Sequence, residues 1–448
     1  MSIDLEKLTQ SMLEAAKTAG ADAADAMAVQ GTSVSIDVRG GVLEQAERSE
    51  GVDLGLRVFV GQRQANVSVS DTSADTLTTM AERAVAMARE APEDPYIGLA
   101  NSDQLVTEWD VGAFELSDPT AEPAPADLQR DACEAEAAAQ AVQGVSQVQS
   151  ATAGYSNSVV HLAASNGFSG GYGRTSRAVS CVAIAGEGDQ MERDFDGDGR
   201  TFQADMRSPQ DVGRIAGERA VERLDARQPP TGAYPVLFDE RISSSLVGHL
   251  LAAANGAMIA RGSSWLRDHL GRDVLPKELS IIEDPFRPRI SGSRPFDAEG
   301  LATRRREIVK DGTLTGWTLD LVNGRKLELD STGNAARGVS SPPSPASWNI
   351  ALTQGSKSRG DLIADMGTGL LITSLIGSTI NPNTGDYSRG AAGFWVENGE
   401  ITHAVNECTI AGNLLEMLKT ITPANDARDY LSRVVPSVLV EGLTLAGN

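Results

Sequence analysis

The sequence is poor in cysteine and lacks any long apolar run. Its three cysteines, Cys133, Cys181 and Cys408, show no C-x-x-C spacing, and an odd number does not suggest a disulfide framework. No run reaches the roughly 18–20 apolar residues that span a membrane. Residues 1–7 are charged and amphipathic, without the apolar core of a signal peptide. We therefore expect a cytoplasmic protein with no membrane contact.

Basic residues are also scarce. Lysine and arginine together number 39 against 61 aspartates and glutamates, which gives a net charge of −22. The densest basic run, residues 304–306, is too short to form a phosphate-binding surface. Because an acidic surface repels phosphate groups, no nucleic-acid partner is expected.

The chain does contain enough hydrophobic residues for a large folded core. With 448 residues and 41% hydrophobic content, it should divide into two or three domains. Apolar residues recur at helical spacing over 5–19 and 77–88, and alternating strands lie between them over 33–69. We expect residues 1–115 to form an N-terminal α/β layer of antiparallel strands with helices. A stretch rich in Ser, Asp, Pro and Ala at 102–126 marks its edge.

A middle α+β domain is predicted over residues 120–228. Asp127 is expected to cap its first helix, strands to fill residues 145–206, and Ser208 to cap a second helix. The proline-containing stretch at 227–232 then marks a second boundary.

The remaining residues, 232–448, predict a strand-rich C-terminal domain with one long helix that begins near Ser243. Asp311-Gly312 and Asn398-Gly399 predict tight hairpin turns, because a type I′ turn needs positive φ at both central residues. A glycine-rich polar loop is expected directly before the second hairpin, over 381–392. Together the three regions define an α+β fold.

Residues 194–199 match the start of a calcium-binding loop, with aspartates at 194, 196 and 198 followed by glycine. The twelfth position is Asp205, where the motif needs a bidentate glutamate, and the flanks predict strands instead of helices. An acidic hairpin tip is the simpler interpretation, and calcium binding by Asp194–Asp205 stays open.

Several stretches of the chain match sequence motifs of one protein family. They are LRVFVGQRQANVSVSD at 56–71, SRPFDAEGLATRR at 293–305, EIVKDGTLTG at 307–316, STGNAAR at 331–337 and NPNTGDYSRGAAGFWVENGE at 381–400. These stretches resemble the TldD/PmbA family, known in older descriptions as modulators of DNA gyrase, and its PmbA (TldE) branch in particular. The resemblance implies an intracellular peptidase system for unfolded or modified peptides. In that system one subunit carries zinc, and a PmbA-like subunit completes the assembly.

In the TldD branch, one helix carries an H-E-x-x-x-H sequence whose histidines hold zinc and whose glutamate can act as general base. The equivalent run in the similar helix here begins at His249, but it has Leu250 at the glutamate position and Ala254 at the second histidine position. That branch also supplies a cysteine ligand after the signature stretch, whereas residues 414–434 contain no cysteine. The resemblance therefore implies no cofactor in this chain and zinc on a TldD-type partner.

A different metal site, made by His249, His403 and Cys408, is an alternative because their donor atoms suit a transition metal. His403 and Cys408, however, are five residues apart on one expected strand. Their side chains therefore start on opposite faces unless a bulge intervenes.

Two functional hypotheses follow. In the first, the chain is the non-catalytic partner of a TldD-like metallopeptidase subunit, as a heterodimer, or forms a homodimer, and it binds an extended peptide. The residues expected at the peptide groove are Asp386, Tyr387, Arg389, Asn334 and Arg337, although each could instead satisfy nearby backbone. In the second, the chain is a homo-oligomeric protein that binds a peptide or small molecule without peptidase activity. A third interpretation, a peptidase active alone, has no specific Ser-His-Asp or Cys-His arrangement to support it.

Overall fold

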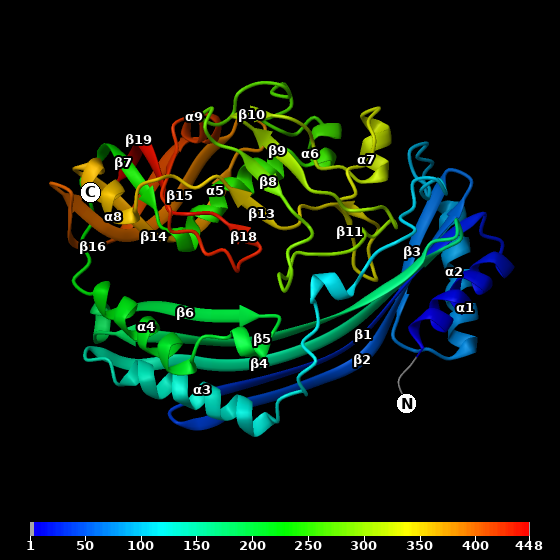
Figure 1. Ribbon diagram of the computed structural model, residues 1–448, viewed down its shortest axis with the longest axis horizontal. Coiled ribbons are helices and arrows are strands. Elements are labelled where there is room, and N and C mark those ends of the chain that lie inside the picture. Colours follow the sequence, from blue (N-terminus) through cyan, green and yellow to red (C-terminus); the bar gives the residue numbers. More distant parts are fainter. Residues whose placement is uncertain (1–3, 448) are drawn as a thin grey trace.

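The computed structural model describes residues 4–447, and in it a long antiparallel sheet lies beneath a strand-rich C-terminal part (Figure 1). The predicted α+β class is confirmed. The long sheet has the strand order β3-β2-β1-β4-β5-β6. Its strands are β1 Ala23–Arg39, β2 Val42–Val60, β3 Arg63–Val69, β4 Val145–Ala164, β5 Ser169–Ala185 and β6 Glu192–Arg200.

This sheet is continuous across the regions expected to form the first two domains. β1 pairs with β2 on one side and with β4 on the other, so residues before 115 and after 120 share one hydrogen-bonded surface. β2 is one unbroken strand of 19 residues. Its polar central stretch, residues 47–51, stays in the sheet because each residue pairs with β1, as Glu50 does with Thr32.

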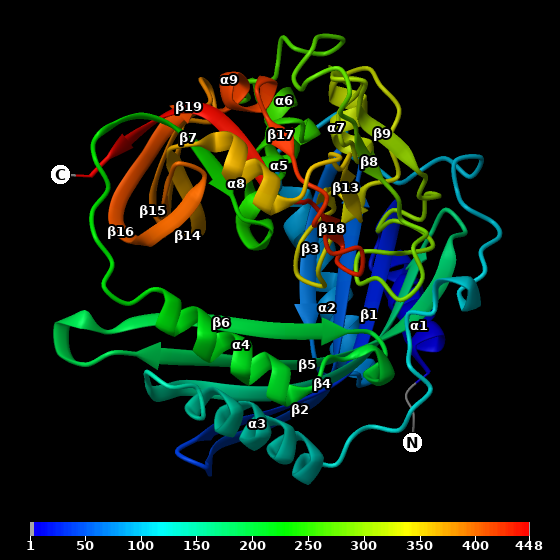
Figure 2. The ribbon, with the colours of Figure 1, turned by 60° about the vertical axis from the view of Figure 1, so that its left-hand side comes forward.

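Helices cover the two ends of the long sheet. α1 (Leu5–Thr18) and α2 (Ala74–Glu90) pack at one end, against β1–β4, and α3 (Pro125–Gln140) and α4 (Pro209–Glu222) pack at the other end, against β1 and β4–β6 (Figures 1 and 2). The side chain of Ser208 caps α4 as predicted, by accepting from the Asp211 N–H. The expected cap at Asp127 is wrong, because α3 starts earlier with Pro125 at its first position.

The C-terminal part is built around a closed ring of five strands. The order β16-β15-β14-β7-β19 returns to β16 through additional pairing between β16 and β19. The ring strands are β7 Gly232–Phe238, β14 Gly369–Ile380, β15 Asp386–Glu397, β16 Glu400–Asn413 and β19 Val438–Ala446, and β17 (Thr422–Pro423) adds to β19. Asn398 and Gly399 join β15 to β16 with φ of 52° and 79°, which confirms the predicted type I′ turn.

Two smaller sheets fill the rest of this part. One has the order β10-β9-β8-β13-β18, and the other pairs β11 with β12. Their strands are β8 Ile281–Glu283, β9 Arg306–Lys310, β10 Thr313–Leu314, β11 Ala335–Ala336, β12 Ser344–Pro345, β13 Ile350–Leu352 and β18 Arg433–Val434. The short helices are α6 Gly256–Ala260, α7 Leu321–Lys326, α8 Arg359–Met366 and α9 Leu414–Lys419, with 3₁₀ turns at Gly112–Phe114, Gly188–Gln190 and Gln203–Asp205.

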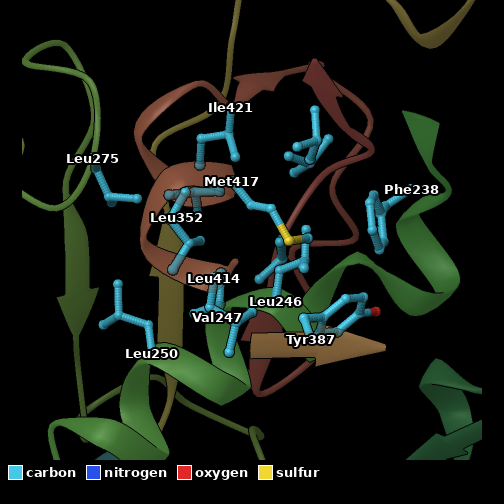
Figure 3. Packing of buried hydrophobic residues seen from close by; sticks show 14 of the residues in the cluster. Phe238, Leu246, Val247, Leu250, Leu275, Leu352, Tyr387, Leu414, Met417 and Ile421 are labelled. Carbon is cyan, nitrogen blue, oxygen red and sulfur yellow. The ribbon is translucent and has the colours of Figure 1, made fainter. Parts of the chain in front are cut away.

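The longest helix of the C-terminal part, α5 (Glu240–Ala253), packs into the apolar core of the ring. It begins three residues before Ser243, the predicted start, because the Asp239 side chain caps it by accepting from the Arg241 N–H. Figure 3 shows Leu246, Val247 and Leu250 of α5 among side chains from β15 and α9. α5 is thereby fixed against the strand that carries part of the signature sequence.

None of the helices within residues 4–447 combines the length and apolar character that crossing a membrane requires.

Candidate functional site

Asp386, Tyr387 and Arg389 lie on β15, and not in a loop as the sequence predicted. β15 starts at Asp386, so the irregular segment before it is limited to residues 381–385. Strand alternation places the Tyr387 side chain in the core and leaves Asp386 exposed. The sequence missed this because glycines at 390 and 393 favour loops, whereas here they allow β14 to approach closely. A Cβ on Gly393 would lie 1.9 Å from the Leu371 carbonyl oxygen.

Tyr387 meets His249 of α5 inside the C-terminal part. Their rings pack edge to face with centroids 5.9 Å apart. The Tyr387 hydroxyl and His249 Nε2 are both buried and have no hydrogen-bond partner among residues 4–447. Burial raises the pKa of Tyr387 to about 12. Burial also lowers the pKa of His249, and the charge of Arg389 lowers it further, so His249 is neutral at neutral pH.

Asp386 and Arg389 remain at the surface of this cluster. The Asp386 carboxylate accepts from Thr384 Oγ1 at 2.6 Å and from Asn413 Nδ2 at 3.3 Å. Arg389 donates through Nε to the Gly377 carbonyl at 2.7 Å. Of the five residues predicted at a peptide groove, these two have the accessibility that direct contact needs.

Asn334 and Arg337 flank β11, which lies at the opposite end of the C-terminal part from β15 (Figure 1). Asn334 is buried and donates to Glu283 Oε1 at 3.0 Å and to the Ala346 carbonyl at 2.8 Å. The buried Arg337 side chain forms an ion pair with Asp25. Both residues therefore hold internal groups in place, and the structure does not gather the five candidates into one site.

Arg337 belongs to a buried charge network that joins the C-terminal part to the long sheet. Asp25 on β1 also accepts from Nε of Arg57, its cross-strand neighbour on β2, at 2.8 Å. Burial alone would raise the pKa of Asp25, but the guanidinium groups of Arg337 and Arg57 hold it below its ordinary value. Sequence reasoning missed this network. Its signal is a charge inside each of two apolar strand runs, at Asp25 and Arg57.

Two further carboxyl groups approach this network from the signature stretch SRPFDAEG. Glu299 lines a small cavity together with Asp25 and Arg57, and it accepts from the Leu321 N–H at 2.9 Å. Asp297 accepts three backbone N–H groups, those of Glu299, Leu301 and Ala335. Burial raises the pKa of Asp297 to about 6. Burial, and then the charge of Asp297, raise the pKa of Glu299 to about 8.

The position of the TldD-branch metal motif does not fit zinc in this chain. His249 supplies one imidazole, whereas Leu250 and Ala254 at the next two key positions are fully buried apolar residues. Leu250 points into the cluster with Val247 and Leu414 (Figure 3). A zinc site needs three or four N, O or S ligands. Within residues 4–447, no three His, Cys, Asp or Glu side chains gather in a way that could hold a metal ion.

His403 and Cys408 do have a bulge between them, where the register of β16 shifts and Glu407 adopts a φ of 49°. The Cys408 thiol nevertheless donates to the Ala391 carbonyl at 3.2 Å, and burial raises its pKa to about 11. His403 Nδ1 lies 3.0 Å from Thr402 Oγ1. Each side chain therefore has its own local partner.

A cleft separates the long sheet from the ring. Its larger cavity, about 880 Å³, lies between β5 and β6 on one side and β14, β15 and β16 on the other. Three exposed apolar side chains line it: Phe195 (60% exposed), Met191 (49%) and Ile376 (69%). Large apolar side chains exposed together mark a binding surface more often than chance. We refer to this cavity as the apolar end of the cleft.

The calcium-like sequence forms β6 along this cleft, so the expected hairpin tip is wrong. Strand alternation turns three aspartates to the same face. Asp194 pairs with Arg241 at 3.0 Å, Asp196 with Arg219 at 2.7 Å, and Asp198 with Arg200 at 3.0 Å. Each of the three carboxylates therefore forms an ion pair with a guanidinium group.

Sequence comparison identifies one family along most of the chain. Residues 24–88 match the PmbA/TldA metallopeptidase domain 1, residues 115–224 its central domain, and residues 231–447 its C-terminal domain. The chain therefore belongs to the PmbA/TldA metallopeptidase family. The Escherichia coli O157:H7 protein named Metalloprotease PmbA is 36% identical over 447 residues, which cover 99% of this chain and 96% of that protein. This match confirms the predicted PmbA branch.

Solved structures have the same fold. A Bacteroides thetaiotaomicron protein described as a modulator of DNA gyrase superposes with a TM-score of 0.91 and 26% identity, and the match covers 100% of both chains. TldE from Thermococcus kodakarensis superposes with a TM-score of 0.85 over 98% of this chain and 100% of that one. Its identity is 19%, so it supports the fold alone.

Proposed function

We propose that this chain is the metal-free PmbA-type subunit of a two-component zinc peptidase that acts in the cytoplasm. In this proposal a TldD-like partner carries the zinc and performs hydrolysis, and this chain helps to bind the peptide. The observation that carries the proposal is that apolar residues replace two key positions of the H-E-x-x-x-H motif. Leu250 and Ala254 occupy these positions, and both are 0% exposed. A glutamate at 250 would place a charge inside that apolar cluster, at a cost of several kcal/mol.

The apolar end of the cleft supports a role in peptide binding. Phe195, Met191 and Ile376 face an open cavity of about 880 Å³, which is large enough for several side chains of an extended peptide. Unfolded peptides expose the apolar residues that folded proteins bury, so such a surface favours them over folded chains. Asp386 and Arg389 lie on β15, the strand that also lines the cleft through residues 390–392.

The subunit role is tested by reconstitution. We expect the untagged chain to contain less than about a tenth of an equivalent of zinc, because one imidazole cannot hold the ion. We also expect peptide cleavage only when this chain is mixed with a partner that carries H-E-x-x-x-H. Metal content is measured by mass spectrometry, and cleavage by release of a fluorophore.

Full activity of the partner alone would refute the subunit role. Near-stoichiometric zinc in this chain would refute the metal-free assignment. If no H-E-x-x-x-H chain is encoded beside this one and the mixture is inactive, the homo-oligomeric binding protein becomes the better interpretation.

The peptide role is tested at Phe195. Phe195→Ser is expected to weaken binding of an apolar fluorescent peptide by about thirtyfold, because it removes roughly 2 kcal/mol of apolar contact. Fluorescence anisotropy with the purified chain measures the Kd. Ile401→Ser is the matched control, since Ile401 is also an exposed apolar strand residue but does not line the cavity. Equal weakening by both substitutions, or by neither, would exclude the apolar end as the binding surface.

A further inference from the structure

The other end of the same cleft is strongly cationic. A second cavity, about 460 Å³, lies between β4, β5 and the end of β6 on one side and the start of α5 and residues 428–433 on the other. Its lining includes six arginines: Arg174, Arg200, Arg241, Arg289, Arg428 and Arg433. Two acidic residues, Asp205 and Glu240, share that lining. This concentration of positive charge stands out in a chain whose net charge is −22.

Four of these arginines are held by carboxylates. Arg200 pairs with Asp198 at 3.0 Å, and Arg241 with Asp194 at 3.0 Å. The other two pairs are Arg289–Asp205 at 3.2 Å and Arg428–Glu240 at 2.7 Å. These ion pairs fix the walls of the cavity and leave the charge of the remaining two arginines uncompensated.

Arg174 and Arg433 are the uncompensated pair. Arg174 donates to the backbone carbonyls of Ser291 and Ser293, so its contacts carry no negative charge. Arg433 is exposed, and within residues 4–447 it has neither an ion pair nor a side-chain hydrogen bond. The hydroxyl groups of serines from β4, β5 and α5 line the space between the walls. Guanidinium forks with hydroxyl donors form the usual protein environment for a carboxylate.

We infer that the cationic end of the cleft binds a carboxylate of the peptide whose apolar residues occupy the apolar end, with Arg433 and Arg174 as the recognising groups. This inference rests on the proposed function, because it assumes that the cleft takes a peptide. The two cavities adjoin at the Arg241–Asp194 ion pair, since Arg241 lines one and Asp194 the other. Along β5, eight residues separate Arg174 from Val182, the cross-strand partner of Phe195, or roughly 26 Å of extended chain. The carboxylate would therefore lie about eight residues from the apolar anchor.

A carboxylate at that spacing has two sources, the peptide's own C-terminus or an Asp or Glu side chain. Three labelled peptides with one apolar core distinguish them. The first ends in a free carboxylate about eight residues after the core and has no acidic side chain. The second is the same peptide with a C-terminal amide, and the third is an amide with glutamate at the eighth position.

Binding is measured by fluorescence anisotropy with the full-length chain. We expect the amide to bind about tenfold more weakly than the free acid, because a charge-assisted hydrogen bond is lost. If the glutamate peptide binds as tightly as the free acid, the site also accepts acidic side chains. If it binds as weakly as the amide, the site recognises the C-terminal carboxylate of a peptide. R433Q is expected to weaken the acid peptide about tenfold and to leave the amide unchanged. R261Q is the matched control, because Arg261 is exposed, lines neither cavity and forms no ion pair within residues 4–447.

The outcomes separate the two proposals. Equal binding of acid, amide and glutamate peptides would overturn the carboxylate site and leave the peptide role intact. Equal effects of R433Q and R261Q would overturn the assignment to Arg433. Absence of binding by all three peptides would overturn the carboxylate site and the proposed peptide role together.

Discussion

Replacing Asp25 with asparagine is expected to lower the free energy of unfolding by about 3–5 kcal/mol, because it leaves two buried guanidinium groups without a counter-charge. Asp25 and Arg57 are buried on adjacent strands of the long sheet, and the buried Arg337 side chain reaches Asp25 from the C-terminal part. Arg337 Nε and Nη2 have no hydrogen-bond partner in the described chain, so the substitution leaves this buried guanidinium without its ion-pair partner. Circular dichroism during urea unfolding measures the change.

Glu218→Gln on α4 is the control for that experiment. Glu218 pairs with Arg214 at 2.7 Å, but both side chains are about half exposed to solvent. An exposed helical pair of this kind contributes roughly 0.3–0.5 kcal/mol. If Asp25→Asn costs no more than Glu218→Gln, the buried network does not hold the two parts of the molecule together.

Stability is expected to fall as the pH rises through neutrality, and Glu299→Gln should remove that slope. Burial and the neighbouring Asp297 raise the pKa of Glu299 to about 8, whereas the unfolded chain releases this proton near 4.5. Between these values the folded state binds one more proton than the unfolded state. The stabilisation is therefore complete below pH 4.5 and is lost as the pH rises through about 8. The loss is about 1.4 kcal/mol per pH unit.

The interval from pH 6.5 to 8 lies between the ordinary pKa of a glutamate and the raised pKa of Glu299. Groups far from this site contribute equally to the natural chain and to Glu299→Gln, so the difference between the two pH profiles reports the change at Glu299. Across the interval the natural chain should lose about 2 kcal/mol of stability relative to Glu299→Gln. Urea unfolding at several pH values measures both proteins, and Glu218→Gln should keep the natural slope. Parallel pH profiles for the natural chain and Glu299→Gln would show that Glu299 ionises normally in the fold.

Local sequence signals predicted the elements whose causes are local. Ser208 caps α4, and Asn398-Gly399 forms its hairpin turn, because side-chain and backbone preferences within a few residues decide both. The pairing of β1 with β4 has no such signal. Asp25 lies opposite Ala164, and nothing near either residue specifies a partner so distant in sequence. The shared sheet therefore emerged only from the structure.

Predicting the site had the same limit. The signature stretches identified the family, and they contain both surface residues and residues that hold buried groups in place. They could not distinguish Asp386, which is exposed, from Asn334 and the side chain of Arg337, which are buried against carboxylates. That distinction depends on which distant segment covers each residue. The cleft could not be predicted from the sequence for a related reason, because its arginines come from five separate stretches of the chain.

The closed ring also constrains the order in which the chain can fold during synthesis. β7 begins at residue 232, but its neighbour β19 starts only at Val438, more than two hundred residues later. The strands of the long sheet end at residue 200 and its last covering helix, α4, ends at Glu222, so this part can assemble while the ribosome is still translating the remainder. Until β19 leaves the exit tunnel, β7 and β16 each present an unpaired edge. The nascent C-terminal part is then at its most exposed to aggregation, and chaperones that shield strand edges should act in that window.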